Sequence, residues 1–321
     1  MSGGDFAALV ASAIPPDRIQ RNAPLAPFTT FKVGGPADWL VHAHRASEVR
    51  KVLAAARASG LPVTVLGGGS NVLVADAGVR GLVIRVHGGD VRAVADGMIR
   101  ADGGLTINGL VRWTIGRGIA GLEAWAGTPG TVGGAIYGNA HFQGRLIAEL
   151  VDSVEVVDPA DPTRHEVRIG AADMEFGYDR SRLQRTRELV MAADFRVGSG
   201  EPAALRAIAR QSLAYRKRTQ PLESASAGCI FQNPDAAVDR VPDGIPASSG
   251  ALVDRAGLKG SREGAARVSP THGNFIVNEG GASADDIRRL IERCREQVRA
   301  QFGVELRDEI VYLGFGPKPK A

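Results

Sequence analysis

The apolar residues of this chain fall into short β-branched runs and into longer runs with a helical period. Short runs such as "ADWLVHA" (37–43) and "LPVTVL" (61–66) predict strands, because branched side chains pack well on a pleated surface. "SEVRKVLAAARAS" (47–59) repeats apolar residues every three or four positions, which predicts a helix. Further elements are expected as strands at 81–86, 151–158, 164–169 and 187–198, a hairpin turn at Asp96-Gly97 and a helix at 106–118.

After residue 200 the pattern changes to helices separated by short strands. The helix predicted at 202–218 has apolar residues at Leu205, Ile208, Leu213 and Tyr215. A last long helix is predicted to start at Ser283, because Ser283 and Asp286 form an S-x-x-D capping pattern. The elements expected here are helices at 202–218, 248–256 and 284–302, strands near 265–269 and 275–278, and a strand pair or one bent strand over 306–314.

These elements predict an α+β protein with two domains. Strands and helices are mixed without a regular βαβα alternation, which argues against a doubly wound parallel sheet. A chain of 321 residues is long enough for two domains of ordinary size. We expect a first domain over 1–200, with subdomains at about 1–95 and 96–200, and a second over 201–321.

Composition and charge exclude several classes of protein. The chain carries a net charge of +4, but its charges alternate in sign and form no long basic block, so nucleic acid is not the expected partner. No apolar run approaches the roughly 20 residues that a membrane-spanning helix needs. The apolar patch from Phe6 to Ile14 has no basic segment before it and predicts a short helix rather than a signal peptide. We therefore expect a cytoplasmic protein with a small-molecule ligand; the sequence does not indicate an oligomeric state.

The two cysteines differ in their surroundings. Cys294 lies on the apolar face of the helix predicted at 284–302 and reads as a core residue. Cys229 lies in "SAGCIFQNP" (226–234), among small residues. A structural disulfide is not expected in a cytoplasmic chain, and the absence of CxxC or HxxxH spacing argues against a metal site. Cys229 therefore remains a buried filler, a nucleophile or a proton donor.

A glycine-rich stretch joins two apolar runs in "LGGGSNVLVAD" (66–76). Glycines allow a ligand to approach the backbone closely, and successive free N–H groups form a concavity for an anion such as phosphate. The side chains of Ser70 and Asn71 add hydrogen-bond donors. The alternative is a tight hairpin connection, although three glycines in succession exceed what a hairpin requires.

A second stretch, "GLEAWAGTPGTVGGAIYGNAH" (121–141), repeats glycine every three or four residues. This spacing predicts a short helix with one face free of side chains, against which a flat ring or a diphosphate could lie. Close packing of that helix on a neighbour is the alternative. Neither stretch reads G-x-G-x-x-G or G-x-x-x-x-G-K-[ST], so a Rossmann site and a P-loop are disfavoured.

Several motifs in a fixed order resemble one family of flavoenzymes. Over residues 28–314 the chain is similar to the UDP-N-acetylenolpyruvoylglucosamine reductase family, which makes UDP-N-acetylmuramate for bacterial peptidoglycan. The motifs are "FTTFKVGGPADW" (28–39), "LGGGSNVLVAD", "AGTPGTVGGAIYGNAH" (126–141), "SAGCIFQNP", "GALVDRAGLKG" (250–260), "VSPTHGNFIVN" (268–278) and "LRDEIVYLG" (306–314).

The resemblance implies a fold and a cofactor. It implies a two-part FAD-binding region of the vanillyl-alcohol-oxidase type, followed by a smaller α+β substrate-binding domain. FAD would be bound non-covalently, which fits the absence of His and Cys from 66–76, and NADPH would be the hydride source. The residues implied for FAD are Gly67, Gly68, Gly69, Ser70 and Asn71 at the phosphates, with Gly127, Thr128, Gly130, Gly133, Gly134 and Gly138 along the isoalloxazine and the rest of the cofactor.

The resemblance also implies a chemistry for Cys229. After hydride transfer from reduced FAD to the enolpyruvyl group, an enolate-like species must be stabilised and its carbon protonated. The family assigns the proton donor to the Ser or Cys of this motif, here Cys229. A free thiol has a pKa of about 8.5, so it is a much stronger acid than a serine hydroxyl and is still protonated at neutral pH.

The stabilising pair implied by the family is Glu309 and an arginine. The family reads Tyr-Arg-x-Ser where this chain reads Tyr178-Asp179-Arg180-Ser181, so the arginine is shifted by one residue. In a strand such a shift would turn the side chain to the opposite face. We predict Arg180, with Arg182 in reserve; surface ion pairs are the alternative for both arginines, and a surface carboxylate for Glu309.

The substrate carries a diphosphate and a carboxylate, so cations are expected near it. The substrate-binding residues predicted from the matching motifs are Arg216, Lys217, Asn233, Lys259, His272 and Asn274. Arg216 and Lys217 end a predicted helix and could simply complement its dipole. No metal ligand is expected. The rival functions are a flavin oxidase, which would consume oxygen, and a colourless nucleotide-sugar-binding protein.

Overall fold

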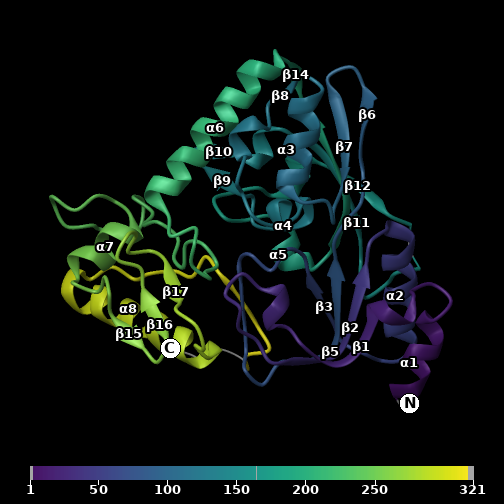
Figure 1. Cartoon of the computed structure of the whole chain (residues 1–321), viewed down its shortest axis with the longest axis horizontal. Coiled ribbons are helices and arrows are strands. Elements are labelled where there is room, and N and C mark those ends of the chain that lie inside the picture. The colour runs from purple at the N-terminus through teal and green to yellow at the C-terminus, as the bar shows by residue number, and fades with distance from the viewer. Residues whose placement is uncertain (1–2, 164, 317–321) are drawn as a thin grey trace. The chain divides into compact units, whose positions relative to one another are not determined.

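The computed structural model describes residues 3–163 and 165–316, without the side chains of residues 3–5 (Figure 1). The chain divides into two compact units, and each combines segments that are distant in sequence. The first unit contains Met1–Ala23, Ala37–Gly68 and Arg80–Ala214, and the second contains Pro24–Pro36, Gly69–Val79 and Tyr215–Ala321.

The division differs from the boundary predicted near residue 200. The chain passes from the first unit to the second inside helix α6 (Pro202–Thr219), between Ala214 and Tyr215. Two early segments also belong to the second unit, whose core holds Phe31 and Leu73. Local hydrophobic patterning cannot reveal this, because it does not say which core an apolar residue will join.

The first unit begins with a four-stranded sheet in the order β1-β2-β5-β3. Strands β3 and β5 are parallel, and the helices α1 and α2 pack against the sheet through a shared apolar core (Figure 1). The elements are α1 (Gly3–Val10), β1 (Ile19–Pro24), β2 (Pro36–Ala43), α2 (Ala46–Ala58), β3 (Val63–Leu66) and β5 (Val79–Val86).

A five-stranded antiparallel sheet, in the order β12-β11-β13-β7-β6, forms the rest of the first unit. Helices α3 and α4 pack against it, and Asp96-Gly97 makes the predicted hairpin turn between β6 and β7. Because β6 belongs to this sheet, the predicted subdivision at residues 95 and 96 cuts through a hairpin. The elements are β6 (Val91–Ala95), β7 (Met98–Asp102), α3 (Ile107–Gly116), α4 (Val132–Tyr137), β11 (Val151–Val157), β12 (Val167–Gly170) and β13 (Leu189–Arg196).

Short elements connect these larger ones in the first unit. Two of them, β9 and β10, form a small hairpin that follows α4. They are β8 (Ile119–Ala120), β9 (His141–Phe142), β10 (Arg145–Leu146), α5 (Leu183–Thr186), β14 (Gly198–Ser199) and the 3₁₀ turns at Pro16–Arg18, Glu123–Trp125, Ile147–Glu149 and Ala171–Met174.

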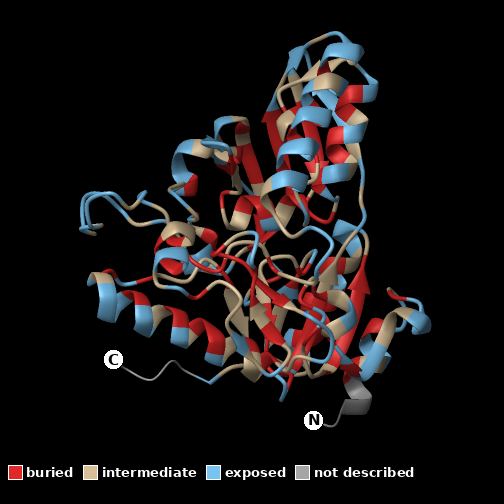
Figure 2. Cartoon of the chain, turned by 60° about the vertical axis from the view of Figure 1, so that its left-hand side comes forward, coloured by how far each residue is buried: buried red, intermediate tan, exposed pale blue. Residues whose placement is uncertain are grey.

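The second unit packs two helices against a three-stranded sheet. Helix α8 buries one face, including Cys294, and exposes the other, an alternation visible in the helices of Figure 2. The predicted capping box is present, with Ser283 and Asp286 bonded reciprocally. The elements are the 3₁₀ turn Ala26–Phe28, β4 (Val72–Val74), α7 (Ser249–Arg255), β15 (Arg262–Glu263), β16 (Ala266–Val268), β17 (Ile276–Asn278), α8 (Ala284–Phe302) and β18 (Val311–Leu313), which runs parallel to β4.

Helix α6 buries a different face from the predicted one. Leu205 is buried, but Ile208, Leu213 and Tyr215 are exposed by 39%, 45% and 38%. The buried face follows helical spacing through Leu205, Ala209, Ser212 and Arg216, so it includes two polar residues that an apolar pattern overlooks.

The α+β class predicted from the sequence is confirmed by this mixture of sheets and helices. Over 306–314 the structure has one short strand, β18, rather than a strand pair or a long bent strand. None of the described helices combines the length and the apolar character that crossing a bilayer requires.

Candidate active site

Cys229 lies in an extended segment of the second unit, held by its neighbours on two sides. It forms a β-bridge with Phe275, and Ile230 N–H donates to the carbonyl of Asn274 at 2.9 Å. On the other side, Glu309 N–H donates to the carbonyl of Ile230 at 2.8 Å. Cys229 is half-buried and is not part of a disulfide. The segment therefore holds Cys229 next to the stretch of chain that carries Glu309.

Asn274 fixes the chain immediately after Cys229. Its Oδ1 accepts from Phe231 N–H at 2.9 Å, and its Nδ2 donates to Phe231 O at 2.7 Å. The Asn274 side chain is 3% exposed, so both of these bonds are made away from water. The amide predicted to bind substrate is thus engaged by the backbone next to Cys229, and it positions that segment.

Glu309 is also tied to the first glycine-rich loop. Asn71 Nδ2 donates to the carbonyl of Glu309 at 3.1 Å, and Val311 N–H donates back to Asn71 O at 3.0 Å. Its neighbour Asp308 instead forms an ion pair with Arg295. Hydrogen bonds therefore bring Asn71, Glu309 and the Cys229 segment together within one unit.

Arg216 is a buried cation near the Cys229 thiol. It is 6% exposed, and burial lowers the pKa of its guanidinium to about 10, although its electrostatic interaction with Cys229 acts in the opposite direction. A guanidinium with that pKa remains charged at neutral pH. Arg216 therefore provides a fixed positive charge where the sequence expected a substrate-binding residue.

The other predicted substrate residues of the second unit have varied partners. Lys217 is exposed, and Asn233 Oδ1 accepts from Ser249 N–H at 3.1 Å, at the start of α7. Lys259 pairs with Asp254 at 2.7 Å. His272 Nδ1 accepts from Asn274 N–H at 3.1 Å, and burial, assisted by the charge of Lys259, lowers the pKa of the His272 imidazole.

The glycines of the loop 67–69 are required by close backbone approaches. In the first unit, a methyl group at Gly67 would lie 2.6 Å from Thr131 Oγ1, and one at Gly68 would lie 2.6 Å from Gly130 Cα. In the second unit, Gly69 has a φ of +64°, and a methyl group there would lie 2.0 Å from Phe28 O. No side chain fits at these positions, and Gly68 meets the second glycine-rich stretch directly.

That second stretch is a loop followed by a short helix, rather than one helix with a bare face. Gly127 and Gly130 have φ values of +83° and +102° and precede α4, so they lie outside the predicted helix. Gly133 packs against Gly103, whose oxygen would lie 3.1 Å from an added methyl group. At Gly138, by contrast, such a group would meet only Gly134 O within 4 Å.

The face of α4 with Gly134 and Gly138 is therefore free of neighbouring side chains in the part of the chain that the structure describes, and it could accept a planar ring. Only Thr131 Oγ1, at 3.5 Å, would lie near a methyl group added at Gly134. Thr131 also caps α4 by accepting from Gly134 N–H at 3.2 Å.

Asn108 is a residue of this region that the sequence analysis did not identify. From α3, its Oδ1 accepts from Gly127 N–H at 2.8 Å and its Nδ2 donates to Thr128 O at 3.3 Å. The side chain thus holds the loop in which Gly127 and Thr128 were predicted to contact FAD. Nothing in the pattern of "TINGL" distinguishes this asparagine from an ordinary residue of a helix.

The turn around Arg180 places its residues in contrasting settings. Arg180 is exposed, and its guanidinium lies over Gly177, at which an added methyl group would be 3.2 Å from Arg180 Nε. Arg182 is engaged by both carboxylate oxygens of Glu188, at 3.0 and 3.3 Å. Asp179 has a φ of +51° and points its side chain inward, to His141.

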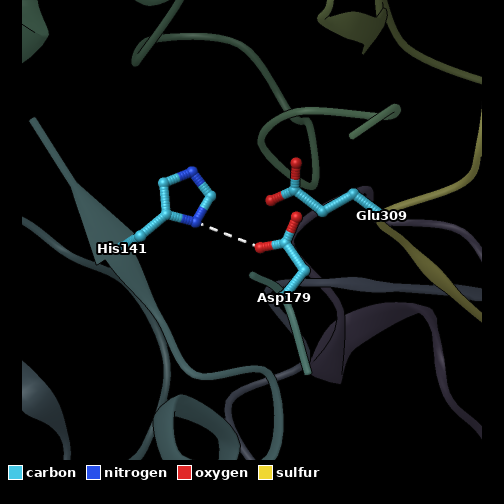
Figure 3. A group of neighbouring side chains, drawn as sticks. All are labelled: His141, Asp179 and Glu309. Carbon is cyan, nitrogen blue, oxygen red and sulfur yellow. Dashed lines mark ion pairs between the residues drawn. The ribbon is translucent and has the colours of Figure 1, made fainter. Parts of the chain in front are cut away.

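Figure 3 shows the Asp179 carboxylate facing the His141 ring, with the ion pair between them. The distance between His141 Nδ1 and Asp179 Oδ1 is 3.0 Å, and both residues belong to the first unit. Glu309, which the figure also labels, belongs to the second unit. Neither His141 nor Asp179 was predicted from the sequence to be a site residue, because they are far apart in sequence and form no recognised spacing.

Comparison with known proteins gives matches over nearly the whole chain. Residues 37–168 match the model of an FAD binding domain, and residues 220–313 match the C-terminal domain of UDP-N-acetylenolpyruvoylglucosamine reductase. A UDP-N-acetylenolpyruvoylglucosamine reductase of Synechococcus sp. (strain WH7803) is 40% identical, with 92% of this chain and 94% of the relative covered. The reductase of Bacillus velezensis is 37% identical over 92% of this chain and 94% of the relative.

A solved structure agrees with these relatives. The crystal structure of UDP-N-acetylenolpyruvylglucosamine reductase from Thermus caldophilus matches with a TM-score of 0.73 and 32% sequence identity. The match covers 92% of this chain and 99% of the crystallised one. The similarity therefore includes the fold as well as the sequence motifs.

Proposed function

The chain belongs to the UDP-N-acetylenolpyruvoylglucosamine reductase family and carries an FAD-binding domain, and from this premise we propose its reaction. It reduces the enolpyruvyl group of UDP-N-acetylenolpyruvoylglucosamine to give UDP-N-acetylmuramate, a precursor of peptidoglycan, with NADPH as the hydride source. The observation that carries the proposal is the hydrogen-bonded connection of Asn71, Glu309 and the Cys229 segment within one unit.

The glycine-rich segments fit FAD. Among the described residues, a methyl group added at Gly138 would meet no side chain within 4 Å, and one at Gly134 would meet only Thr131 Oγ1. The loop 67–69 consists of glycines and presents only backbone. In this proposal Gly67, Gly68, Gly69, Ser70 and Asn71 hold the phosphates. The residues that would hold the ring and the rest of the cofactor are Gly127, Thr128, Gly130, Gly133, Gly134 and Gly138. When bound, FAD supplies the capacity to carry a hydride between two substrates.

Cys229 provides the proton in this proposal. Its thiol is half-buried, and the hydrogen bonds of Asn274 and Glu309 to the adjoining backbone limit its movement. A thiol held in place loses little entropy when it protonates a carbon beside it. The positive charge of Arg216 nearby stabilises the thiolate that remains after the proton has left.

Glu309 and a cation stabilise the charge that develops on the substrate. Glu309 is held at its backbone on both sides, by Ile230 and Asn71, so its side chain starts from a fixed position. Arg180, in the turn of the Tyr-Asp-Arg-Ser sequence, is the arginine predicted to act with it. A preorganised charge of this kind lowers the energy of the enolate more than that of the substrate.

The anionic groups of the nucleotide sugar are bound by the basic residues of the second unit. Arg216, Lys217, Lys259 and His272 are the proposed partners of the diphosphate and the carboxylate. Asn233 and Asn274 complete the substrate-binding set of the proposal. Their amide groups hold the backbone at Ser249 and Phe231, so we assign them the positioning of this surface.

The test is steady-state oxidation of NADPH by the purified holoenzyme, followed at 340 nm. We expect NADPH oxidation to require UDP-N-acetylenolpyruvoylglucosamine and to yield UDP-N-acetylmuramate, identified by mass spectrometry. Oxygen consumption with no need for the enolpyruvyl substrate would instead indicate a flavin oxidase. A colourless preparation that binds UDP-sugars without oxidising NADPH would instead indicate a binding protein without this activity.

A further inference from the structure

His141 and Asp179 form a partly buried ionisable pair that the proposed mechanism does not use. Its two side chains are 27% and 8% exposed, and they contact each other through His141 Nδ1 and Asp179 Oδ1 (Figure 3). The ring of Tyr178 packs on the imidazole, with ring centres 4.9 Å apart. His141 is thus held on one side by a carboxylate and on one face by an aromatic ring.

Hydrogen bonds place this pair at the end of the second glycine-rich stretch. Ser181 Oγ donates to Tyr137 O at 2.8 Å, and Asn139 Nδ2 donates to Gly177 O at 2.8 Å. Tyr137 ends α4, and His141 follows it by four residues. The turn that carries Asp179 is therefore fixed to the helix that we propose lies against the flavin ring.

One oxygen of this buried carboxylate has no hydrogen-bond donor. Within residues 3–163 and 165–316, Asp179 Oδ2 is buried and has no partner. A buried polar atom without a partner costs about 1–3 kcal/mol, so such atoms in native proteins usually have a ligand or water as their partner. A carboxylate oxygen left unsatisfied in this way calls for a hydrogen-bond donor, such as a ligand hydroxyl or a bound water.

The imidazole offers a complementary group. Asp179 accepts from Nδ1, so Nε2 lies on the opposite side of the ring, as Figure 3 shows. In the imidazolium form both nitrogens donate hydrogen bonds, one to Asp179 and the other to an anion. The partly exposed ring can therefore present a directed cation from a rigid support.

The two arginines of the neighbouring turn are less well placed for a buried anion. Arg180 is exposed, and Arg182 is bound by both oxygens of Glu188. Asp179 occupies the inward position of the turn with a φ of +51°, a conformation that a short aspartate tolerates better than a long side chain. The basic side chain that Asp179 holds beside this turn is therefore His141.

We propose that His141 binds the carboxylate of the enolpyruvyl substrate through Nε2–H, while Asp179 fixes the orientation of its ring. The inference rests on the proposed function for the identity of the ligand. His141 then touches the substrate and shares the stabilisation of the developing negative charge. Asp179 is a positioning residue, whose second oxygen accepts a hydrogen bond from the ligand or from a water bound with it.

The test compares two ligands that differ by the group in question. UDP-N-acetylmuramate carries the carboxylate, and UDP-N-acetylglucosamine lacks the whole lactyl ether. Binding of each to the oxidised holoenzyme is measured from the change in the flavin absorbance spectrum. We expect His141→Ala to lower the affinity for UDP-N-acetylmuramate about 10- to 100-fold, the usual range for a hydrogen bond to a charged group. The affinity for UDP-N-acetylglucosamine should change less than threefold.

Two further variants test the roles within the pair. His141→Gln retains an N–H donor without the charge, and we expect it to recover about a tenth to a half of the lost affinity. Asp179→Asn should lower the affinity for UDP-N-acetylmuramate by about 3- to 10-fold, because the His141 ring is still hydrogen-bonded but no longer paired with a carboxylate. His165→Ala removes an exposed histidine of the same unit and is the matched control.

The two half-reactions separate a substrate contact from a structural role. In stopped-flow experiments, His141→Ala should slow the oxidation of reduced flavin by the enolpyruvyl substrate about 100-fold and leave flavin reduction by NADPH within threefold of wild type. A general distortion of the site would slow both half-reactions.

Several results would overturn the inference. One is equal weakening of the two ligands by His141→Ala, and another is unchanged binding of both. A third is loss of the preference for UDP-N-acetylmuramate in Arg180→Ala but not in His141→Ala, which would assign carboxylate binding to Arg180 instead. If the wild-type holoenzyme binds neither ligand, the proposed function fails, and the assignment of His141 fails with it.

Discussion

The two cysteines of this protein show how position decides what a thiol can do. Cys294 lies on the inner face of a 19-residue helix, is 1% exposed, and has a thiol pKa raised to about 12 by burial. Cys229 lies half-buried in an extended segment, near the guanidinium of Arg216. The two residues have the same side chain, but Cys294 is enclosed in the core whereas Cys229 is partly exposed.

The difference follows from how each segment is held. Helix α8 satisfies its own backbone bonds, so Cys294 is fixed by packing and contributes as an apolar residue. The segment at Cys229 obtains its bonds from Asn274 and Glu309, so its position depends on two distant parts of the chain. A reactive group held in this way is positioned by tertiary contacts rather than by local structure.

The largest expected effect comes from removing the Cys229 thiol. Cys229→Ala should slow oxidation of reduced flavin by the substrate about 1,000-fold, since a positioned proton donor typically contributes 100- to 10,000-fold, and should leave flavin reduction by NADPH unchanged. Cys229→Ser should retain turnover, because the hydroxyl can also deliver a proton. Stopped-flow absorbance measures both half-reactions, and rapid steady turnover by Cys229→Ala would falsify the proton-donor role.

The next effect concerns the asparagine that holds the Cys229 segment. Asn274→Ala leaves both backbone groups of Phe231 buried without partners, and we expect it to lower the free energy of unfolding by about 2–3 kcal/mol. The matched control is Asn233→Ala, which removes the acceptor of Ser249 N–H at an exposed residue and should lower the free energy of unfolding by less than about 1 kcal/mol. Urea unfolding followed by circular dichroism makes the comparison; equal losses would contradict it.

A smaller effect separates the two cysteines by stability. Cys294→Ser places a hydroxyl among apolar neighbours and should lower the free energy of unfolding by about 1–2 kcal/mol. Cys229→Ser, at a half-buried position, should change it by less than about 0.5 kcal/mol. The same urea titrations measure both variants. Equal losses of unfolding free energy in Cys229→Ser and Cys294→Ser would contradict the predicted difference between the two positions.

The smallest effect is the dependence of stability on alkaline pH. Because burial raises the pKa of Cys294 to about 12, the unfolded chain loses this proton at lower pH than the folded one. The contribution of Cys294 to the free energy of unfolding is therefore fully present below the pKa that its thiol has in the unfolded chain. It is lost as pH rises, by about 1 kcal/mol between pH 9 and 10. Unfolding at both pH values should show this loss in the wild type and its absence in Cys294→Ala; an equal loss in both proteins would exclude Cys294 as its source.

Helix boundaries and strand positions were the part of the fold that the sequence predicted well. Helix α8 and its capping box occur where the S-x-x-D pattern and the apolar period indicated. These features depend on residues within a few positions of one another, so they can be read from the sequence. The buried face of α6 was predicted wrongly, because Ser212 and Arg216 are buried by tertiary contacts that override their polarity.

The motifs of the candidate site were visible in the sequence, but the contacts among them were not. The motif around Cys229 and the glycine-rich loops were identified from the sequence, and the family relationship was confirmed by the matches along the chain. The pairing of His141 with Asp179 could not be predicted, because 37 intervening residues separate them and neither lies in a recognised spacing. The hydrogen bonds of the Asn274 side chain to Phe231 could not be predicted either, because these residues are also far apart in sequence.

By itself, the sequence determined the α+β class, the order of most elements, the core position of Cys294 and the family. Those follow from local periodicity, capping and short motifs, whose physical causes act over a few residues. Only the tertiary structure decided which core each early segment joins, which face of α6 is buried and which groups meet His141 and Cys229. Such contacts depend on chain segments far apart in sequence, whose meeting is set by the packing of the whole unit.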